Sequence, residues 1–261
     1  ITARGGGGGG GAGGGGRMRI EYNHSSLTRD NYDVSPGEAD ADPGSLIILD
    51  VDDDTVYLIE DFRFPSAALQ NMGSIRIIGV NITMNATLNF SVGMFSMVNA
   101  SIEGAPENTT TNLTMNATNM EIKNSILTSL LIVNITSTNT TIDESSVINA
   151  SDTAYDGPGA GADDDGGHPY GSGAGHGGKG LDSPGTPPTL AGLSYDSARN
   201  PVNPGSQGGR GDDGNSGAAR GGGAVFIRGS RLNMSGNITV SGGTVFTDND
   251  AAGGGSGGSI N

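Results

Sequence analysis

The sequence of 261 residues contains no cysteine and no tryptophan, and aromatic residues make up only 5% of it. The absence of cysteine excludes the disulfide framework that holds many small secreted domains together. The shortage of large side chains argues against a conventional globular core of this length. No run of 18 apolar residues exists, so no membrane-spanning helix is predicted, and no signal peptide is recognisable.

Basic residues are also scarce. The chain has 13 lysines and arginines but 28 aspartates and glutamates, which gives a net charge of −15. Such a charge argues against nucleic acid as a partner. It suits a solvated extracellular surface and is compatible with divalent cations. Glycine, in contrast, is abundant, with 48 residues, and apolar residues gather in 45–150 and 224–247. A narrow β-solenoid filled by Ile, Val, Leu, Ala and Met fits this composition, because it needs few large side chains.

Thirteen of the asparagines begin an N-x-S/T triplet, the acceptor sequence for N-glycosylation. This density is well above chance, and it predicts a glycosylated surface in a secreted protein. One competing interpretation is that Asn, Ser and Thr are merely frequent on a polar strand face. Another is an inward ladder of asparagines, in which each amide bonds to the next coil. The predicted glycosylation sites are Asn23, Asn81, Asn85, Asn89, Asn99, Asn108, Asn112, Asn116, Asn134, Asn139, Asn149, Asn233 and Asn237.

Five of these triplets share one pattern and recur at intervals of 18, 17, 18 and 15 residues. Repeats of this kind are typical of solenoids, in which each repeat buries its apolar face against its neighbours. The segments are rich in Ile, Val and Thr and alternate in polarity, so they predict strands rather than helices. The prediction is a parallel β-helix with coils of about 18 residues. The five triplets begin at Asn81, Asn99, Asn116, Asn134 and Asn149.

Alternation along a strand fixes which side chains point inward, because successive side chains face opposite sides of a sheet. The middle residue of each triplet should be buried, and the asparagine should face solvent. Glycans on the five asparagines would then form a row along one flank. Val133 is also expected to be buried, and Thr83 and Thr136 exposed. The residues predicted to be buried in the triplets are Ile82, Ala100, Ala117, Ile135 and Ala150.

The chain is expected to be one β-solenoid segment, residues 1–261, with four zones. These are a glycine-rich entry (1–44), glycosylated coils (45–154), an insertion rich in Gly, Pro and Asp (155–223), and further coils (224–261). The insertion has too few apolar residues to form a core. Both ends lie in glycine-rich sequence with no capping helix or charged strand, which indicates a piece of a longer chain.

Local signals refine this division. The predicted strands are Met18–Tyr22, Ser45–Val51, Thr55–Phe62, Ala224–Arg228, Arg231–Val240 and Thr244–Phe246. Asp52–Asp54 should form a turn between two of these strands. A single helical turn is expected over Pro65–Met72.

The glycine-rich part carries Gly-Ala-Gly-His176-Gly-Gly-Lys-Gly, then Asn203-Pro-Gly-Ser-Gln-Gly-Gly, then Arg220-Gly-Gly-Gly-Ala-Val-Phe-Ile-Arg. With these motifs the chain resembles the large glycine-rich surface proteins of eukaryotes that have a pectin-lyase-like fold. The resemblance is clearest over 155–261. It implies a right-handed parallel β-helix in an extracellular protein of structural role. The chain departs from that pattern in its sequon density and in its lack of cysteine.

Residues that carry chemistry are few. Asp50–Asp54 begins like a calcium loop, but Thr55 stands where such a loop needs glycine, so a solvated turn is the better interpretation. Asp163–Asp165 is interpreted as a solubilising run. His176 between glycines and the pair Asp212–Asp213 resemble polygalacturonase motifs, but in reversed order and without their companions. The Arg-Gly-Asp triplet at 210–212 is interpreted as coincidental. No catalytic residue, metal site or cofactor is therefore predicted, and calcium stays an unsupported option.

The predicted function is that of a structural extracellular glycoprotein, part of a cell-surface coat or filament. Copies of itself or neighbouring solenoid segments, joined head to tail, are the expected partners. The alternative is a carbohydrate-active β-helix, either a pectin-lyase-like enzyme or a carbohydrate-binding module. An ice-binding face made of threonine rows is a third, weaker option.

Overall fold

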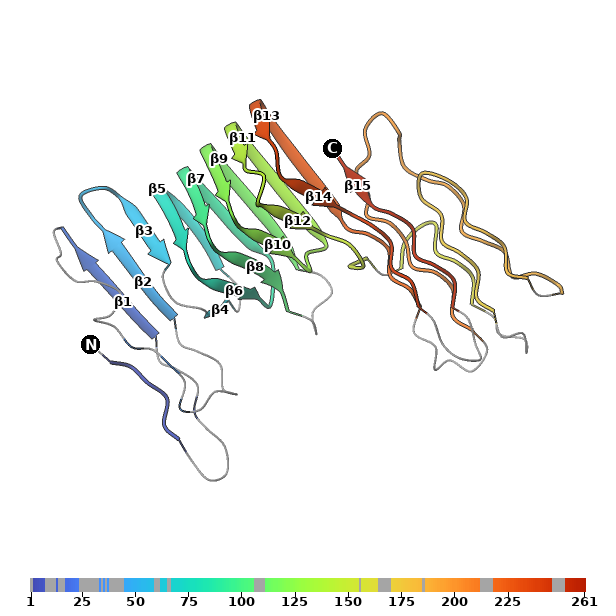
Figure 1. The fold of residues 1–261 in the computed structure, drawn as a ribbon, viewed down its shortest axis with the longest axis horizontal. Helices are drawn as coiled ribbons and strands as arrows, with labels where there is room; N and C mark the ends of the chain where they lie inside the picture. Colours follow the sequence, from blue (N-terminus) through green and yellow to red (C-terminus); the bar gives the residue numbers. More distant parts are fainter. Residues whose placement is uncertain are drawn as a thin grey trace.

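The structure is a computed structural model of the chain. It describes residues 2–7, 13, 17–23, 33, 35, 37, 45–58, 62–64, 67–105, 111–154, 156–163, 170–184, 186–211, 218–245 and 252–261. Within these residues the fold is all-β, without a helix, and most strands pair in parallel (Figure 1). The strands are β1 (Arg17–Tyr22), β2 (Ser45–Asp50), β3 (Thr55–Leu58), β4 (Phe62–Phe64), β5 (Ala67–Ile78), β6 (Asn81–Met84), β7 (Leu88–Val98), β8 (Ser101–Gly104), β9 (Asn112–Lys123), β10 (Ile126–Thr128), β11 (Ile132–Ile142), β12 (Val147–Asn149), β13 (Ala224–Met234), β14 (Asn237–Thr239) and β15 (Ser259–Ile260).

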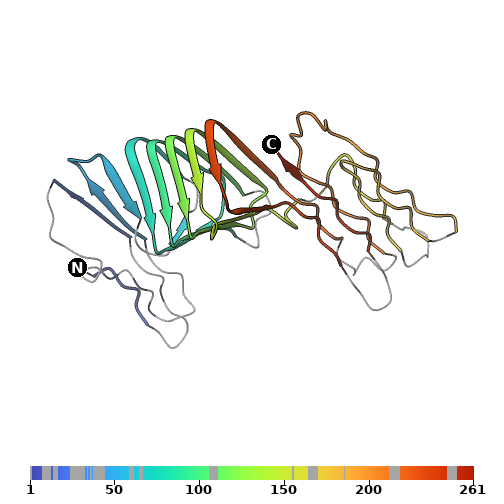
Figure 2. The ribbon, with the colours of Figure 1, turned by 45° about the horizontal axis from the view of Figure 1, so that its top comes forward.

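Two sheets share these strands. The long sheet has nine strands in the order β1-β2-β3-β5-β7-β9-β11-β13-β15, and the short sheet has six in the order β14-β12-β10-β8-β6-β4. From β5 onward the chain alternates between them, so each long strand is followed by a short one. We call one long strand and the following short strand a rung. Figure 2 shows the rungs stacked in sequence order with the two sheets facing each other.

Successive rungs are longer than the sequence repeat suggested. Cross-rung hydrogen bonds join residues 20 apart (Asn81 and Ser101), 25 apart (Ser96 and Glu121) and 20 apart (Asn119 and Asn139). The predicted period of about 18 residues was therefore wrong. The sequence repeat was counted between similar triplets. The alignment of one rung with the next depends instead on the length of the link between a short strand and the following long strand, and this length varies.

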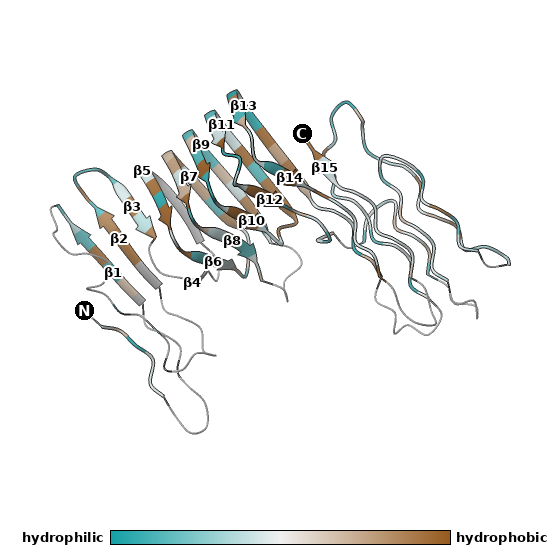
Figure 3. Cartoon of the chain, in the orientation of Figure 1, coloured by the Kyte–Doolittle hydropathy of each residue, from teal (hydrophilic) through white to brown (hydrophobic). Residues whose placement is uncertain are grey.

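Side chains between the two sheets form columns that run along the stack. In the short sheet Ile82, Ile102, Leu127 and Ile148 stand in register, and each is fully buried. Figure 3 shows hydrophobic residues alternating with hydrophilic ones along the strands. Such columns bury apolar area in every rung without large side chains, at about 25 cal/mol per Å². The prediction of burial is confirmed for Ile82, Ala100, Val133, Ile135 and Ala150. Thr136 is exposed as predicted, but the prediction for Thr83 was wrong, because Thr83 is half-buried.

Ala117 departs from this pattern. It is only partly buried, although it packs against the core. It lies just before a bend of the long sheet, where two consecutive residues are exposed in two rungs, Thr118 and Asn119 in β9 and Thr138 and Asn139 in β11. A break in the strict alternation turns the strand, so the long sheet wraps around the core.

The corner between a long strand and the following short strand has its own signature. Gly79, Asn99 and Asn124 occupy this corner in three successive rungs, and each has a positive φ, of 66°, 51° and 43°. Glycine and asparagine adopt the left-handed conformation most readily. Part of the asparagine enrichment therefore comes from the backbone at this corner.

The N-terminal end of the long sheet reverses direction. The turn at Val51–Asp54 joins β2 and β3 as an antiparallel hairpin, which confirms the predicted turn. β1 pairs with β2 in parallel, so β1 and β2 both run opposite to the rungs. Among the described strands, β1 lies at this edge of the long sheet, and it carries Arg19 and Glu21.

Two local expectations were also wrong. The segment from Ala67 is strand β5 rather than a helical turn, and Pro65 and Ser66 lie outside the described residues. Alternating polarity in a chain that stacks on neighbours on both sides favours the strand. Thr244 and Val245 belong to no strand, and Phe246 lies outside the described residues. The predicted strand 231–240 divides into the end of β13 and β14, with Gly236 at the corner.

The glycine-rich segments form an ordered bundle beside the last rungs, on the right of Figure 1. We use the name glycine bundle for residues 156–163, 170–184, 186–211, 218–223, 240–245 and 252–258. Hydrogen bonds between its segments recur every third residue: Gly205 and Gly208 donate to the carbonyls of Gly222 and Ala219, at 2.7 and 2.8 Å. The polyproline II helix has the same period, three residues per turn. The spacing recurs where Ser172 and Gly175 donate to Ala162 and Gly159, Gly253 and Ser256 to Gly209 and Ser206, and Gly255 and Gly258 to Gly243 and Val240.

With three residues per turn, the backbone groups of a segment point in three directions, so a segment can bond to more than two neighbours. A strand in a sheet can pair with only two. Residues 204–210 bond on one side to 218–223, on a second to 252–258, and through Gln207 to Gly161. The described residues of the insertion, predicted to have too few apolar side chains for a core, are instead joined by hydrogen bonds between backbone segments. Its order comes from backbone hydrogen bonds, which do not require apolar side chains.

Candidate functional site: the sequon surface and the His176 pocket

Twelve of the thirteen predicted glycosylation sites lie among the described residues, and none of the twelve is fully buried. Asn108 lies outside the described residues. The exposed sites are Asn23, Asn81, Asn99, Asn116, Asn139, Asn233 and Asn237. The half-buried sites are Asn85, Asn89, Asn112, Asn134 and Asn149.

The five repeated triplets do not form the predicted row. Asn81 stands in register with Ser101, not with Asn99, which occupies a corner. Asn116 lies on the long sheet beside Thr136, and Asn149 lies on the short sheet. The sites are therefore distributed over both outer faces and the corner between them, because the rung length differs from the repeat length.

Several of these asparagines hydrogen-bond to the next rung. Asn139 Nδ2 donates to Asn119 Oδ1 at 2.9 Å, and Asn124 Nδ2 donates to Asn99 Oδ1 at 2.7 Å. These two amide pairs are exposed on the outer surface, so they do not form the inward ladder of the competing interpretation. Hydrogen bonds between side chains of neighbouring strands stabilise the pairing of one rung with the next.

The amide of Asn149 has a defined orientation. Its Oδ1 accepts the backbone N–H of Ser151 at 3.0 Å and the hydroxyl of Thr239 at 2.9 Å. Because a backbone N–H can only donate, the oxygen must point toward it. The nitrogen that would carry a glycan is left on the other side of the amide.

Asn112 and Asn134 are two of the half-buried sites. Each has a buried amide oxygen without a hydrogen-bond partner in the structure. A buried polar atom without a partner is costly, by about 1–3 kcal/mol. At these two sites the unmodified side chain is therefore in an unfavourable environment.

A second candidate site is a pocket of about 690 Å³ where the glycine bundle meets β15. His176, Lys179, Tyr195 and Asp196 line it together with Ser259. The ring of His176 packs on Tyr195, with ring centres 4.7 Å apart. The sequence signal for this site was the glycine-flanked histidine, whereas nothing in the sequence indicated Tyr195 or Asp196.

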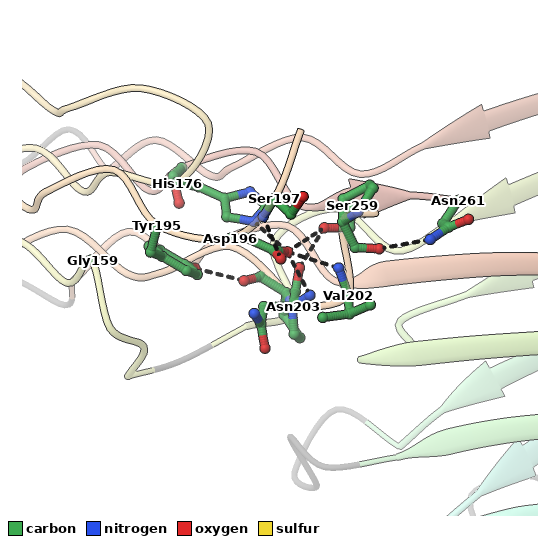
Figure 4. Close-up of polar contacts among 12 residues, drawn as sticks. Gly159, His176, Tyr195, Asp196, Ser197, Val202, Asn203, Ser259 and Asn261 are labelled. Atoms are coloured by element: carbon green, nitrogen blue, oxygen red, sulfur yellow. Dashed lines mark hydrogen bonds and ion pairs between the residues drawn. The ribbon is translucent and has the colours of Figure 1, made fainter. Parts of the chain in front are cut away.

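Asp196 is the most constrained carboxylate of the pocket. Its φ is 68°, and its carboxylate accepts the backbone N–H groups of Ser197 at 2.7 Å and of Val202 and Asn203 at 2.8 Å (Figure 4). Burial raises its pKa, but the three backbone donors and His176 outweigh burial, so the pKa lies well below 3.8. The carboxylate closes the loop from 196 to 203.

The histidine, aspartate and serine of this pocket do not form a nucleophilic triad. His176 Nδ1 bonds to the carbonyl of Gly257 at 2.8 Å, and its Nε2 lies 3.4 Å from Asp196 Oδ2. Ser259 Oγ donates to the carbonyl of Asn203 at 2.6 Å. Because a nucleophile must bond to its base, this geometry is that of a structural clasp. It joins three segments of the glycine bundle.

The other sequence candidates lie apart. Asp53 N–H donates to Asp50 within the hairpin turn, and Asp54 accepts the N–H of Gly73 at 2.6 Å. Asp163 accepts the N–H of Arg210, while Asp164, Asp165, Asp212 and Asp213 lie outside the described residues. Among the described residues, no group of three or more acidic or histidine side chains is placed to hold a metal ion.

Comparisons with known proteins add no relative. No family model matches the chain, and neither curated proteins nor solved structures give a match. In the described part of the chain, no helix has the length and hydrophobicity needed to cross a membrane.

Proposed function

We propose that this chain is a structural extracellular glycoprotein: a right-handed parallel β-helix whose outer faces carry N-linked glycans, in a cell-surface coat or filament. Two sheets joined rung by rung around columns of aliphatic side chains support the β-helix. The observation that carries the glycoprotein proposal is that all twelve described sequon asparagines are at least partly exposed.

The site geometry supports a structural role rather than catalysis. Cleavage of glycosidic bonds commonly uses two carboxylates a few ångströms apart. The His176 pocket contributes Asp196, whose oxygens already accept several hydrogen bonds. Asp182 is bonded to Lys179 and to the N–H of Ala191. These carboxylates fix loops, so we propose no enzymatic activity and no cofactor for this chain.

Assembly along the stacking axis, with copies of itself or with neighbouring solenoid segments, is part of this proposal. A β-helix end exposes strand edges, and such edges take up further strands. Glycans on the outer faces would restrict lateral contacts, and a net charge of −15 would add repulsion between neighbouring stacks.

Glycopeptide mapping of the native protein by mass spectrometry tests the proposal. We expect occupancy at exposed sites such as Asn116, Asn233 and Asn237, which lie on three different strands. Asn119 and Asn124, which are exposed but head no sequon, are internal controls and should be unmodified. Unmodified asparagine at every mapped sequon would refute the glycoprotein proposal and favour the amide ladder as the reason for the asparagines.

A further inference from the structure

The amide of Asn149 has a fixed direction relative to the rungs on either side of it. Its Oδ1 accepts the N–H of Ser151 at 3.0 Å and the hydroxyl of Thr239 at 2.9 Å. Thr239 belongs to β14 on the following rung and stands in register with Asn149. The amide nitrogen, which would carry a glycan, is therefore directed away from β14, toward the side of β10 on the preceding rung.

Two other predicted glycosylation sites have the same direction. The hydroxyl of Ser101 donates to Asn81 Oδ1 at 2.6 Å, and Asn124 Nδ2 donates to Asn99 Oδ1 at 2.7 Å. In both pairs the donor lies on the rung that follows the asparagine. At all three sites the amide oxygen faces the following rung, so a glycan on the nitrogen would lean over the preceding one.

On the preceding side of Asn149 the outer surface carries an exposed apolar side chain. Thr128 on β10 stands in register with Asn149, and Ile126 faces the same side of the short sheet as Thr128. Ile126 is 46% exposed although β10 is an interior strand, paired with β8 on one side and β12 on the other. With strands about 4.8 Å apart and about 3.3 Å per residue, the backbone of Ile126 lies about 8 Å from that of Asn149.

We propose that the N-linked glycan on Asn149 packs across β10 of the same chain and covers Ile126. This inference rests on the proposed function, because it requires a glycan at Asn149. A sugar ring presents C–H groups on its faces and hydroxyl groups at its rim. It can therefore cover Ile126 while it bonds to Thr128 and to Glu103, an exposed carboxylate in register with Thr128. Covering the isoleucine removes apolar surface from water, which is favourable.

The other glycosylation sites near Ile126 are less well placed to cover it. Asn81 on β6 and Asn237 on β14 each lie two strands away from β10 in the short sheet. The amide oxygens of Asn81 and Asn99 face the side on which β10 lies, so their nitrogens are directed away from it. Asn149 lies on the adjacent strand and has its nitrogen on the correct side, which makes its glycan the expected occupant.

Thiol labelling tests the direction of the glycan, because the chain has no cysteine of its own. In the glycosylated chain, Thr128→Cys places a thiol on the preceding rung. Ser241→Cys places one on the following rung, where the N–H of Ser241 donates to Ser151 Oγ at 3.0 Å. Each is compared with the same variant carrying Asn149→Gln, which cannot be glycosylated there. The glycan should slow maleimide labelling several-fold at position 128 and leave position 241 unchanged. No slowing at 128, or equal slowing at 241, overturns the proposal.

Melting temperatures test the contact with Ile126. Asn149→Gln is measured in the native sequence and in Ile126→Ser, so that loss of the amide's own hydrogen bonds cancels in the difference. The fall in melting temperature should be larger by about 2–4 °C when Ile126 is present, as burial of part of an isoleucine predicts. Asn116→Gln is the matched control. Its neighbours in register, Ser91 and Thr136, are exposed and polar, so its effect should not depend on residue 126.

Glycopeptide mapping of the same samples distinguishes this inference from the proposed function. An unmodified Asn149 in a chain glycosylated at other sequons overturns the inference alone, whereas a chain without any glycan overturns both. A glycan at Asn149 whose removal has the same effect with and without Ile126 also overturns the inference, and it leaves the glycoprotein proposal in place.

Discussion

A methyl group added to Gly192 tests whether the glycine bundle is packed as the hydrogen bonds indicate. Gly192 is buried, its N–H donates to Gly173 and its carbonyl accepts from Gly180, both at 3.0 Å. A Cβ at this position would overlap the carbonyl of Gly159. Its φ is not in the left-handed region, so the clash with a neighbouring segment is the whole effect. Overpacking and weakened hydrogen bonds should together cost about 2–4 kcal/mol.

The assay is thermal unfolding of Gly192→Ala, followed by hydrogen exchange of residues 170–195. At about 2–4 °C per kcal/mol for a chain of this size, the melting temperature should fall by about 4–15 °C. Faster exchange confined to the bundle would show that the damage is local.

The matched control is Gly178→Ala, because a Cβ there meets no atom within 4 Å. This variant should keep the melting temperature or raise it slightly, since alanine restricts the unfolded chain. Equal melting temperatures for the two variants would refute the close packing of the bundle.

Two further predictions concern the core and the clasp. Ile135→Asp should destabilise the protein by more than about 4 kcal/mol, because a carboxylate would replace a fully buried side chain. Thr136→Asp, at an exposed neighbour, should change the melting temperature little; the reverse order would mean that the strand phase is wrong. The pKa of Asp196 is lowered on folding, so its contribution to stability is complete above its ordinary value of 3.8 and is lost as the pH falls below it. Asp196→Asn should therefore flatten the acid side of the stability–pH curve, and a curve unchanged below about pH 4 would contradict the clasp.

Strand alternation and composition were sufficient to predict much of the fold. Alternation in the triplets placed Ile82 and Ile135 inside and Asn81 outside, because side chains on a strand must face opposite sides. The run of three aspartates between two alternating segments identified the turn at Asp52–Asp54. Absence of tryptophan and scarcity of aromatics indicated a narrow interior, and Phe90 and Phe95 are the largest of its fully buried side chains.

Register, in contrast, could not be predicted from similar triplets. Asn81 and Asn99 look equivalent in sequence, yet one begins a short strand and the other turns a corner in the left-handed conformation. The difference arises from links of unequal length between rungs. The packing of the glycine bundle could not be predicted either. A glycine has no side chain whose size or polarity would indicate its neighbours, so the sequence did not reveal the hydrogen-bond partners of Gly192.

The sequence by itself determined most of the strand content, most inward positions and the exposed Asn81, Asn99 and Asn116, because these depend on period-two alternation within one segment. Only the tertiary structure decided which rungs align and how the glycine segments pack. It also placed Arg19 and Glu21 on β1, at an edge of the described long sheet, and left Leu232 and Met234 exposed on β13. Those features depend on hydrogen bonds and side-chain contacts between residues far apart in the chain. The local sequence around a residue does not show which distant residues it will contact.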